Sequence, residues 1–236
     1  MNDSILAVIF DMDGVLVDSY QAHYESWRAV AREEGLAITE LQFAAGFGRT
    51  SREVIASLWA ARRYTHEKIA LMDQRKEAVF REVLAAEFPA MPGARELVAA
   101  LGDRGFSLAV GSSAPPENID LCLDRLRVRD RFSAVVSALD VTRGKPDPQV
   151  FLLAAQRLGV PPSKCAVVED AGLGVQAAHA AGMVAIGLVS TGRTRESLAA
   201  AELVVDKLGD LDPAAIRTLI LSHSLPPAAR LAPESG

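Results

Sequence analysis

The sequence predicts an α/β protein with a doubly wound parallel sheet and a small all-helical segment inserted after its first strand. Short apolar runs alternate with helical stretches along most of the chain, which favours parallel strands joined by helices. No strand pattern occurs between Leu16 and Pro92. Several apolar runs end in acidic or glycine-rich turns, as expected where a binding site follows the carboxyl edge of a parallel sheet.

The predicted strands are short apolar runs: Ile5–Phe10, Ser107–Gly111, Ala134–Ser137, Cys165–Glu169, Val184–Leu188 and, as a possible sixth, Leu203–Val205. Arg95–Arg104 and Pro148–Leu158 are predicted as crossover helices of right-handed strand–helix–strand units. A glycine follows each of these helices, which is typical of a helix end.

The insert is predicted to be helical because its apolar residues recur at intervals of three and four residues. This pattern covers Ala22–Glu34, Thr50–Arg62 and His66–Glu87. Hinges are expected near Val17–Tyr20 and at Pro89, Pro92 and Gly93. We therefore expect a core of residues 1–17 and 93–222, a cap of residues 18–92, and a flexible tail of residues 223–236, which is rich in Pro, Ala and Ser.

Composition narrows the class of protein. Half of the 236 residues are apolar, enough for a sizeable core, and a net charge of −5 without a basic stripe argues against a nucleic-acid partner. No segment reaches membrane-spanning length and the first residues lack a basic leader, so we expect a cytoplasmic protein without a membrane partner. We expect a monomer or weak dimer. Cys122 and Cys165 lie in no zinc or disulfide pattern and are expected in the core.

The first strand ends in Phe10-Asp11-Met12-Asp13-Gly14, which places two carboxylates where a buried strand should stop. Gly14 allows a sharp turn without a side-chain clash. Asp11 and Asp13 are expected on the same side, because side chains alternate along an extended chain. Alone, such a run could be a solvated acidic turn.

Three further motifs follow in order: Val110-Gly111-Ser112-Ser113, Gly144-Lys145-Pro146-Asp147-Pro148, and Val167-Val168-Glu169-Asp170 leading into Ala171-Gly172-Leu173-Gly174. Together with the first motif, they resemble the four signature motifs of the haloacid dehalogenase superfamily, in its phosphatase and β-phosphoglucomutase-like branch. The resemblance covers residues 5 to about 220 and implies a Rossmann-like core with a helical cap.

The resemblance points to Mg²⁺-dependent phosphoryl transfer. Asp11 is the candidate nucleophile, which would form an aspartyl-phosphate, and Asp13 is the candidate general acid and base. Two carboxylates beside a phosphate dianion require a cation, and Mg²⁺ prefers oxygen ligands. The resemblance implies that Asp11 and Asp170 supply carboxylates and Asp13 its backbone carbonyl, while Glu169 is either a ligand or a neighbour of the ligands.

Lys145, Ser112 and Ser113 are the candidate phosphate-binding residues. A lysine between Gly144 and Pro146 can act as a point charge on the phosphoryl oxygens and on the nucleophile. Ser112 ends a strand and offers a hydroxyl and nearby backbone amides. The alternatives without a catalytic role are a solvated surface group for Lys145 and a simple helix cap for Ser112.

The cap is expected to close over the site and select the substrate, a small phosphorylated metabolite. His23 and Arg52 align with positions that engage the sugar phosphate and the distal phosphate in β-phosphoglucomutases, and Lys76 falls where a further cap lysine occurs in that group. The alternatives are a satisfied helix residue for His23 and solvated side chains for Arg52 and Lys76. The chain departs from the Lys-Gly-x-Ser-Arg cap run of those mutases, since Phe47-Gly48-Arg49-Thr50-Ser51-Arg52 lacks the lysine.

A phosphatase of a sugar phosphate or similar phosphomonoester is the leading hypothesis. A β-phosphoglucomutase, which interconverts β-glucose 1-phosphate and glucose 6-phosphate, is the alternative with the same core site. A dehalogenase is disfavoured because displacing a halide requires neither Asp13 nor a metal at Glu169 and Asp170. A non-catalytic binding module on this fold would be expected to have lost Asp11 or Lys145, and both are present.

Overall fold

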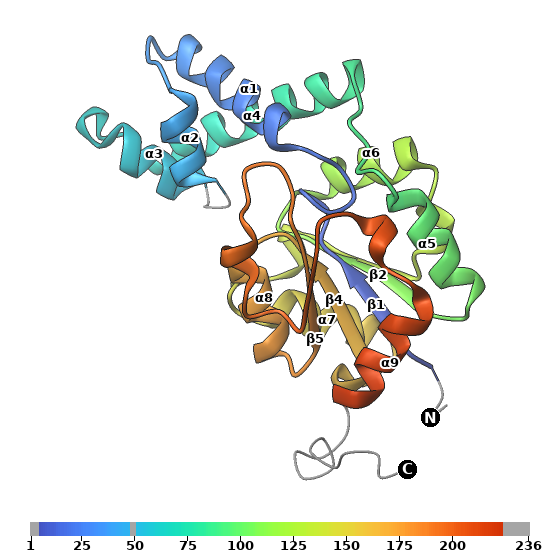
Figure 1. The fold of residues 1–236 in the computed structure, drawn as a ribbon. Helices are drawn as coiled ribbons and strands as arrows, with labels where there is room; N and C mark the ends of the chain where they lie inside the picture. Colours follow the sequence, from blue (N-terminus) through green and yellow to red (C-terminus); the bar gives the residue numbers. More distant parts are fainter. Residues whose placement is uncertain (1–4, 48–50, 224–236) are drawn as a thin grey trace, which may run out of the picture. The chain divides into compact units, whose positions relative to one another are not determined.

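The computed structural model describes residues 5–47 and 51–223, in which the central element is a six-stranded parallel sheet (Figure 1). The strands lie in the order β3-β2-β1-β4-β5-β6. The strand order reverses between β1 and β4, which places the switch point of the doubly wound sheet at its centre.

The strands are β1 (Ala7–Phe10), β2 (Ser107–Gly111), β3 (Ala134–Val136), β4 (Cys165–Glu169), β5 (Val184–Leu188) and β6 (Leu203–Val205). The α-helices are α1 (Tyr20–Glu33), α2 (Glu40–Gly46), α3 (Ser51–Leu58), α4 (His66–Ala86), α5 (Ala94–Asp103), α6 (Pro116–Leu126), α7 (Gln149–Leu158), α8 (Gly172–Ala180) and α9 (Pro213–His223). Short 3₁₀ helices are η1 (Ala60–Arg62), η2 (Arg129–Arg131), η3 (Ala138–Asp140), η4 (Pro162–Lys164), η5 (Arg195–Leu198) and η6 (Leu208–Asp210).

Helices cover both faces of the sheet. α7 and α8 pack on one face, and α5 and α9 pack on the other (Figure 1). One hydrophobic cluster joins Ala7, Ile9 and Val167 of the central strands to Phe151 of α7 and Val175 of α8. The central strands are buried on both faces, which explains their uninterrupted apolar sequences.

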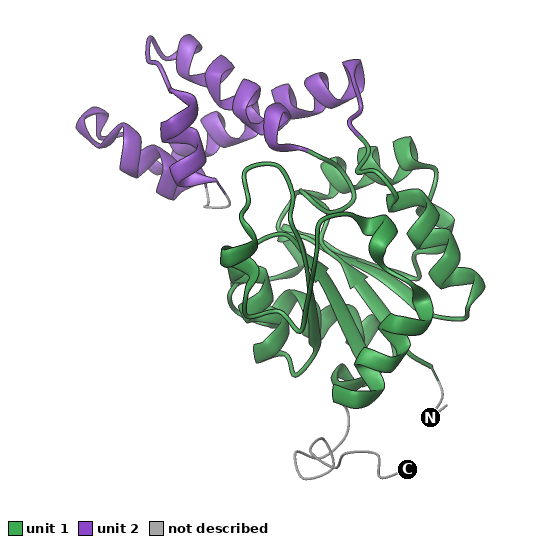
Figure 2. Ribbon diagram, in the orientation of Figure 1, with its two compact units in different colours: residues 1–18, 90–236 green, residues 19–89 purple. Residues whose placement is uncertain are grey.

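The chain forms two compact units, shown in green and purple in Figure 2: residues 1–18 with 90–236, and residues 19–89. The sequence predicts the boundaries between core and cap at 17/18 and 92/93, whereas the two compact units meet at 18/19 and 89/90. Within the first unit, Val17 makes isolated bridges to Asp13 and Ala90, and the Met91 amide donates to the Leu16 carbonyl over 3.1 Å. These contacts hold together the segments that leave and re-enter the sheet-containing unit.

The second unit, residues 19–89, has an aromatic core of its own. Tyr20 lies edge-on to Phe43 and Phe47, with both pairs of ring centroids 5.1 Å apart, and Trp27 contacts Trp59 in the same manner. Thr39 begins α2 with a reciprocal capping box to Gln42. The described part of this unit contains helices and no strand, as the sequence predicts.

Several predictions are corrected by the structure. The helix predicted over Thr50–Arg62 is two elements, α3 and η1, while Thr50 lies outside the described residues. The tail is predicted from residue 223, but His223 is the last residue of α9, and residues 224–236 are outside the described part.

The prediction that both cysteines lie in the core is confirmed. Cys122 and Cys165 are buried, and burial raises the pKa of the Cys165 thiol to about 12.

No helix in the described ranges is long and apolar enough to span a membrane.

Candidate active site

The sheet register brings the first and last motifs together at the switch point. Phe10 of β1 is paired with Val168 of β4, so the residues that follow each strand emerge side by side. The Asp11 amide continues the ladder by donating to the Val168 carbonyl over 2.9 Å. Asp11, Glu169 and Asp170 therefore meet at the carboxyl edge, where an open parallel sheet binds its ligands.

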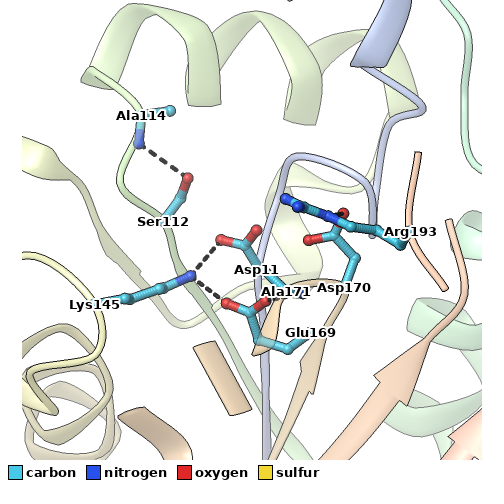
Figure 3. A network of polar contacts seen from close by, with 8 residues as sticks. All are labelled: Asp11, Ser112, Ala114, Lys145, Glu169, Asp170, Ala171 and Arg193. Carbon is cyan, nitrogen blue, oxygen red and sulfur yellow. Dashed lines mark hydrogen bonds and ion pairs between the residues drawn. The ribbon is translucent and has the colours of Figure 1, made fainter. Parts of the chain in front are cut away.

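Lys145 joins two of these carboxylates. Its Nζ lies 2.7 Å from Asp11 Oδ1 and 2.5 Å from Glu169 Oε1 (Figure 3). The ammonium also sits 4.9 Å from the ring centroid of Phe151, the apolar residue beneath it on α7. The Lys145–Pro146 peptide bond is cis. The lysine is thus held between a core aromatic ring and two acids, and the alternative of a solvated surface group is excluded.

Glu169 is fixed through both carboxylate oxygens. Oε1 accepts from Lys145, and Oε2 accepts from the Ala171 amide over 3.0 Å. Its side chain lies against Gly174, where a Cβ atom would come within 1.9 Å of Glu169 Cδ. Only a glycine at position 174 leaves room for this carboxylate.

Asp170 is held by a second set of contacts. Its Oδ2 accepts from Ser190 Oγ over 2.7 Å and lies 3.3 Å from Arg193 Nε (Figure 3). Gly14, with φ +75°, packs against the same carboxylate, and a Cβ there would lie 2.1 Å from Oδ2. The predicted turn role of Gly14 therefore has a second cause, the close approach of Asp170.

Burial opposes the ionisation of two of these acids, Asp11 and Asp170. Burial raises the pKa of Asp11 well above its usual range, and Glu169, Asp170 and Asp13 add to this effect while Lys145 opposes it. Burial also raises the pKa of Asp170 to about 6, against the opposing influence of Arg193. For Lys145, burial lowers the pKa, but Asp11 and Glu169 outweigh it and the net direction is upward.

A divalent cation fits this cluster. Ligand oxygens of Asp11, Glu169 and Asp170 lie within 4.8 Å of one another, and all three residues are buried. The donor set is entirely oxygen, which is the set that Mg²⁺ prefers. Since Lys145 and the Ala171 amide already occupy the Glu169 oxygens, the geometry favours Asp11 and Asp170 as ligands and Glu169 as the residue that positions the lysine.

The remaining core candidates lie at the same edge. Asp13 is half-buried and close enough to Asp11 for its charge to affect the Asp11 pKa. Ser112 is buried, its amide donates to the Val136 carbonyl, and its Oγ accepts from the Ala114 amide over 3.1 Å. Ser113 is exposed and is not part of the network in Figure 3.

In the helical unit, the structure brings His23 and Lys76 together. Lys76 Nζ lies 2.9 Å from His23 Nδ1 and 2.7 Å from Glu77 Oε1, and the Lys76 side chain is only 6% exposed. The His23 ring stacks on Phe80, with centroids 4.2 Å apart. Arg52 is exposed on α3 and does not join this pair.

Sequence reasoning missed Ser190 and Arg193. They lie in the loop after β5, which matches none of the four motifs and whose residue types are ordinary for a turn. The one available signal was position: the loop follows β5, a strand paired on both sides, at the carboxyl edge of the sheet, where ligand-binding residues gather.

The chain matches known proteins along most of its length. The family model described as haloacid dehalogenase-like hydrolase matches residues 5–182. A β-phosphoglucomutase of Bacillus subtilis is 32% identical over 211 residues, covering 87% of this chain and 91% of the relative. A fructose-1-phosphate phosphatase of Escherichia coli is 34% identical over 186 residues, covering 79% and 97%.

A solved β-phosphoglucomutase structure from Clostridium difficile matches with a TM-score of 0.81 and 26% identity, covering 93% of this chain and 98% of that one. The similarity thus spans both the sheet-containing unit and the helical unit. The chain belongs to the haloacid dehalogenase-like hydrolases, in the branch of β-phosphoglucomutases and related sugar phosphatases, and is a phosphoryl-transfer enzyme.

Proposed function

We propose that the protein is a Mg²⁺-dependent phosphatase of a small phosphomonoester, a sugar phosphate, and that it works through an aspartyl-phosphate. The observation that carries the proposal is the placement of Asp11: its carboxylate contacts Lys145 and lies with Asp170 in one buried acidic cluster. Relatives named for the hydrolysis of fructose 1-phosphate and of phosphorylated carbohydrates support the substrate class.

In the proposed reaction, a carboxylate oxygen of Asp11 forms a bond to phosphorus while the bond from phosphorus to the leaving oxygen breaks. Asp13 gives its proton to that leaving oxygen. A water molecule then attacks the phosphoryl group, Asp13 takes its proton, and inorganic phosphate leaves with Asp11 regenerated. In both steps the Lys145 ammonium would stabilise the negative charge on Asp11 and on the phosphoryl oxygens.

Asp11 and Asp170 would hold the Mg²⁺, together with the Asp13 carbonyl. Bound there, the ion would neutralise charge on the phosphoryl oxygens and favour the ionised form of Asp11, whose pKa is raised by burial. Ser112, which follows β2, is proposed to donate a hydrogen bond to the substrate phosphate, and Ser113, which is exposed, is proposed to lie beside it at the phosphate site.

His23, Lys76 and Arg52 are the proposed substrate-recognition residues of the helical unit. The buried Lys76–His23 pair offers a positive group with a fixed orientation, set by Glu77 and by the Phe80 ring. Fixed, partly desolvated cations suit the recognition of phosphate and sugar hydroxyl groups. Arg52, which is exposed, would contribute a distal charge.

A β-phosphoglucomutase is the second candidate, favoured by the B. subtilis relative and the C. difficile structure. It would use the same residues, with a sugar hydroxyl in place of water as the phosphoryl acceptor. The aspartyl-phosphate would then have to survive while a bisphosphate intermediate reorients.

One assay separates the two candidates. The purified protein is incubated with Mg²⁺ and β-glucose 1-phosphate, primed with a trace of glucose 1,6-bisphosphate, while free phosphate and glucose 6-phosphate are followed together. The proposal predicts phosphate release, after which fructose 1-phosphate and other phosphomonoesters rank the substrates. Glucose 6-phosphate without matching phosphate release would instead make the protein a mutase.

A further inference from the structure

The loop that follows β5, residues 189–194, contributes a cation to the acidic cluster. The Nε atom of Arg193 lies 3.3 Å from Asp170 Oδ2, and the two side chains are 18% and 3% exposed. In Figure 3 the Arg193 side chain extends past the Asp170 carboxylate, in the direction of Asp11. None of the four sequence motifs contains this arginine.

The position of Arg193 is built into the loop. The Arg193 amide donates to the Ser190 carbonyl over 3.0 Å, and Thr191 Oγ1 donates to Asp18 Oδ2 over 2.7 Å. The loop is anchored at its start as well, because the Val189 amide donates to the Val205 carbonyl. Arg193 is therefore held at the cluster by its own backbone and by two neighbouring segments.

The role of Arg193 is argued from the balance of charges in the cluster. Lys145 contacts Asp11 and Glu169, and Arg193 contacts Asp170, while Asp13 adds a further negative charge nearby. When ionised, these four carboxylates exceed the two cations by two charges. That excess of two negative charges matches one divalent cation. Binding of the cation would bring a second positive group to the Asp170 carboxylate, whose Oδ2 Arg193 already contacts.

We propose that Arg193 is the internal counter-ion of Asp170, which stabilises the metal-free site and competes with the divalent cation for that carboxylate. Ser190 has the opposite effect on metal affinity, because its neutral hydroxyl orients Asp170 without opposing the ion. Arg193 is thus a positioning residue that weakens metal binding, while Ser190 is one that strengthens it. This inference rests on the proposed metal role of Asp170.

The test is the Mg²⁺ affinity of the metal-free full-length protein, measured by isothermal titration calorimetry at pH 8.5. Arg193→Met should tighten Mg²⁺ binding by about 5-fold or more, because a like charge is removed next to the ion. Ser190→Ala should weaken it by about 10-fold, the usual effect of losing a hydrogen bond to a ligating carboxylate. Arg193→Lys, which keeps the charge, should remain near the wild type.

Arg195→Met is the matched control, since Arg195 pairs with Asp206 2.7 Å away, outside the cluster, and is half-exposed. It should change Mg²⁺ affinity by less than about 2-fold. Arg193→Gln removes the same charge as Arg193→Met with smaller change in polarity, and serves if Arg193→Met does not fold. In both neutral variants the melting temperature without metal should fall, and saturating Mg²⁺ should restore it.

Weaker or unchanged Mg²⁺ binding in the neutral variants would overturn the proposal, since a purely structural role predicts that losing Arg193 acts in the same direction as losing Ser190. If the wild type binds no Mg²⁺, the metal role in the proposed function falls together with this inference. Wild-type binding with no gain in the neutral variants removes the inference alone.

Discussion

Two glycines set the positions of Glu169, the last residue of β4, and of Asp170, which follows it. Gly174 leaves space for the Glu169 carboxylate, and Gly14 leaves space for that of Asp170; a Cβ at either position would lie within 2.1 Å of a carboxylate atom. Both glycines belong to the sequence motifs, but the sequence alone suggests only turns and helix starts for them. Their contact partners become apparent once β1 and β4 are paired.

Gly174→Ala should damage the site although it lies within helix α8. Glycine to alanine in a helix ordinarily stabilises by about 0.5–1 kcal/mol, but here the added methyl group meets Glu169 Cδ at 1.9 Å. We expect a lower melting temperature and reduced turnover, because displaced Glu169 no longer positions Lys145. The control is Gly102→Ala in α5, where the added methyl meets Arg131 Nη1 at an ordinary 3.5 Å. An equal stabilisation by both changes would contradict this interpretation of Gly174.

Asp13→Ala should reduce turnover by about 100-fold or more, because the leaving oxygen and the attacking water lose their proton carrier. In the first turnover, which reports formation of the aspartyl-phosphate, the defect should be smaller for aryl phosphates, whose acidic leaving groups depart without protonation. Turnover and melting temperature would be measured together. A similar first-turnover defect for sugar and aryl phosphates would exclude Asp13 as the acid.

At the scale of secondary-structure elements, hydrogen bonds and an ion pair join the segment after β3 to α7. Asp140, the last residue of η3, accepts hydrogen bonds from the Ser137 amide and hydroxyl over 2.8 Å and lies 2.5 Å from Arg157 Nη2. Arg157 also donates to the Val135 carbonyl. The contacts fix the start of the segment that leads to Lys145.

Asp140→Asn should destabilise the protein in a pH-dependent way. Hydrogen bonds from Arg157 and Ser137 lower the pKa of Asp140 to about 2, below its usual value of 3.8. A depressed acid pKa stabilises the folded state above the unfolded-state pKa, and that stability is lost as the pH falls through the folded-state pKa. The difference in unfolding free energy between wild type and variant should hold from pH 7 to 5 and shrink below about pH 4. Urea unfolding at each pH measures it, and a constant difference would refute the assignment.

The elements differed in how well they could be predicted. Strands such as Cys165–Glu169 and Val184–Leu188 were predicted with correct bounds, because a strand buried on both faces is a continuous apolar run ended by a polar turn. α8 was missed: it is rich in glycine and alanine, and its buried residues give no amphipathic stripe. α2 was missed because its seven residues are too few to show a helical period.

The candidate site was predictable as far as its motifs reach. Asp11, Lys145, Glu169 and Asp170 come together as expected, since strand order and parallel pairing determine which strand ends are neighbours. Ser190 and Arg193 could not be identified, because their role depends on the path of one loop rather than on a spacing. The Lys76–His23 contact joins α4 to α1 across 53 residues of sequence, a separation that no local pattern encodes.

For the molecule as a whole, a buried acidic cluster should make stability depend on metal. Burial raises the pKa values of Asp11 and Asp170, so ionising them without a cation costs stability. Mg²⁺ at 100 times its dissociation constant should stabilise the wild type by about 2.7 kcal/mol. Thermal unfolding at pH 8 with EDTA and with Mg²⁺ measures this. The shift should be lost in Asp170→Asn; an equal shift in that variant would place the ion elsewhere.

The measurement that tests the central claim most directly is detection of the phosphorylated intermediate. Asp13→Asn, expected to slow the attack of water, is mixed with Mg²⁺ and an aryl phosphate, whose leaving group departs without protonation, then quenched in acid, digested and analysed by mass spectrometry. The account predicts phosphate on the peptide that contains Asp11, no such peptide in Asp11→Asn, and no turnover by that second variant. Asp103→Asn, in an exposed pair with Arg131, should behave as the wild type. Turnover by Asp11→Asn without any phosphorylated peptide would contradict the covalent mechanism.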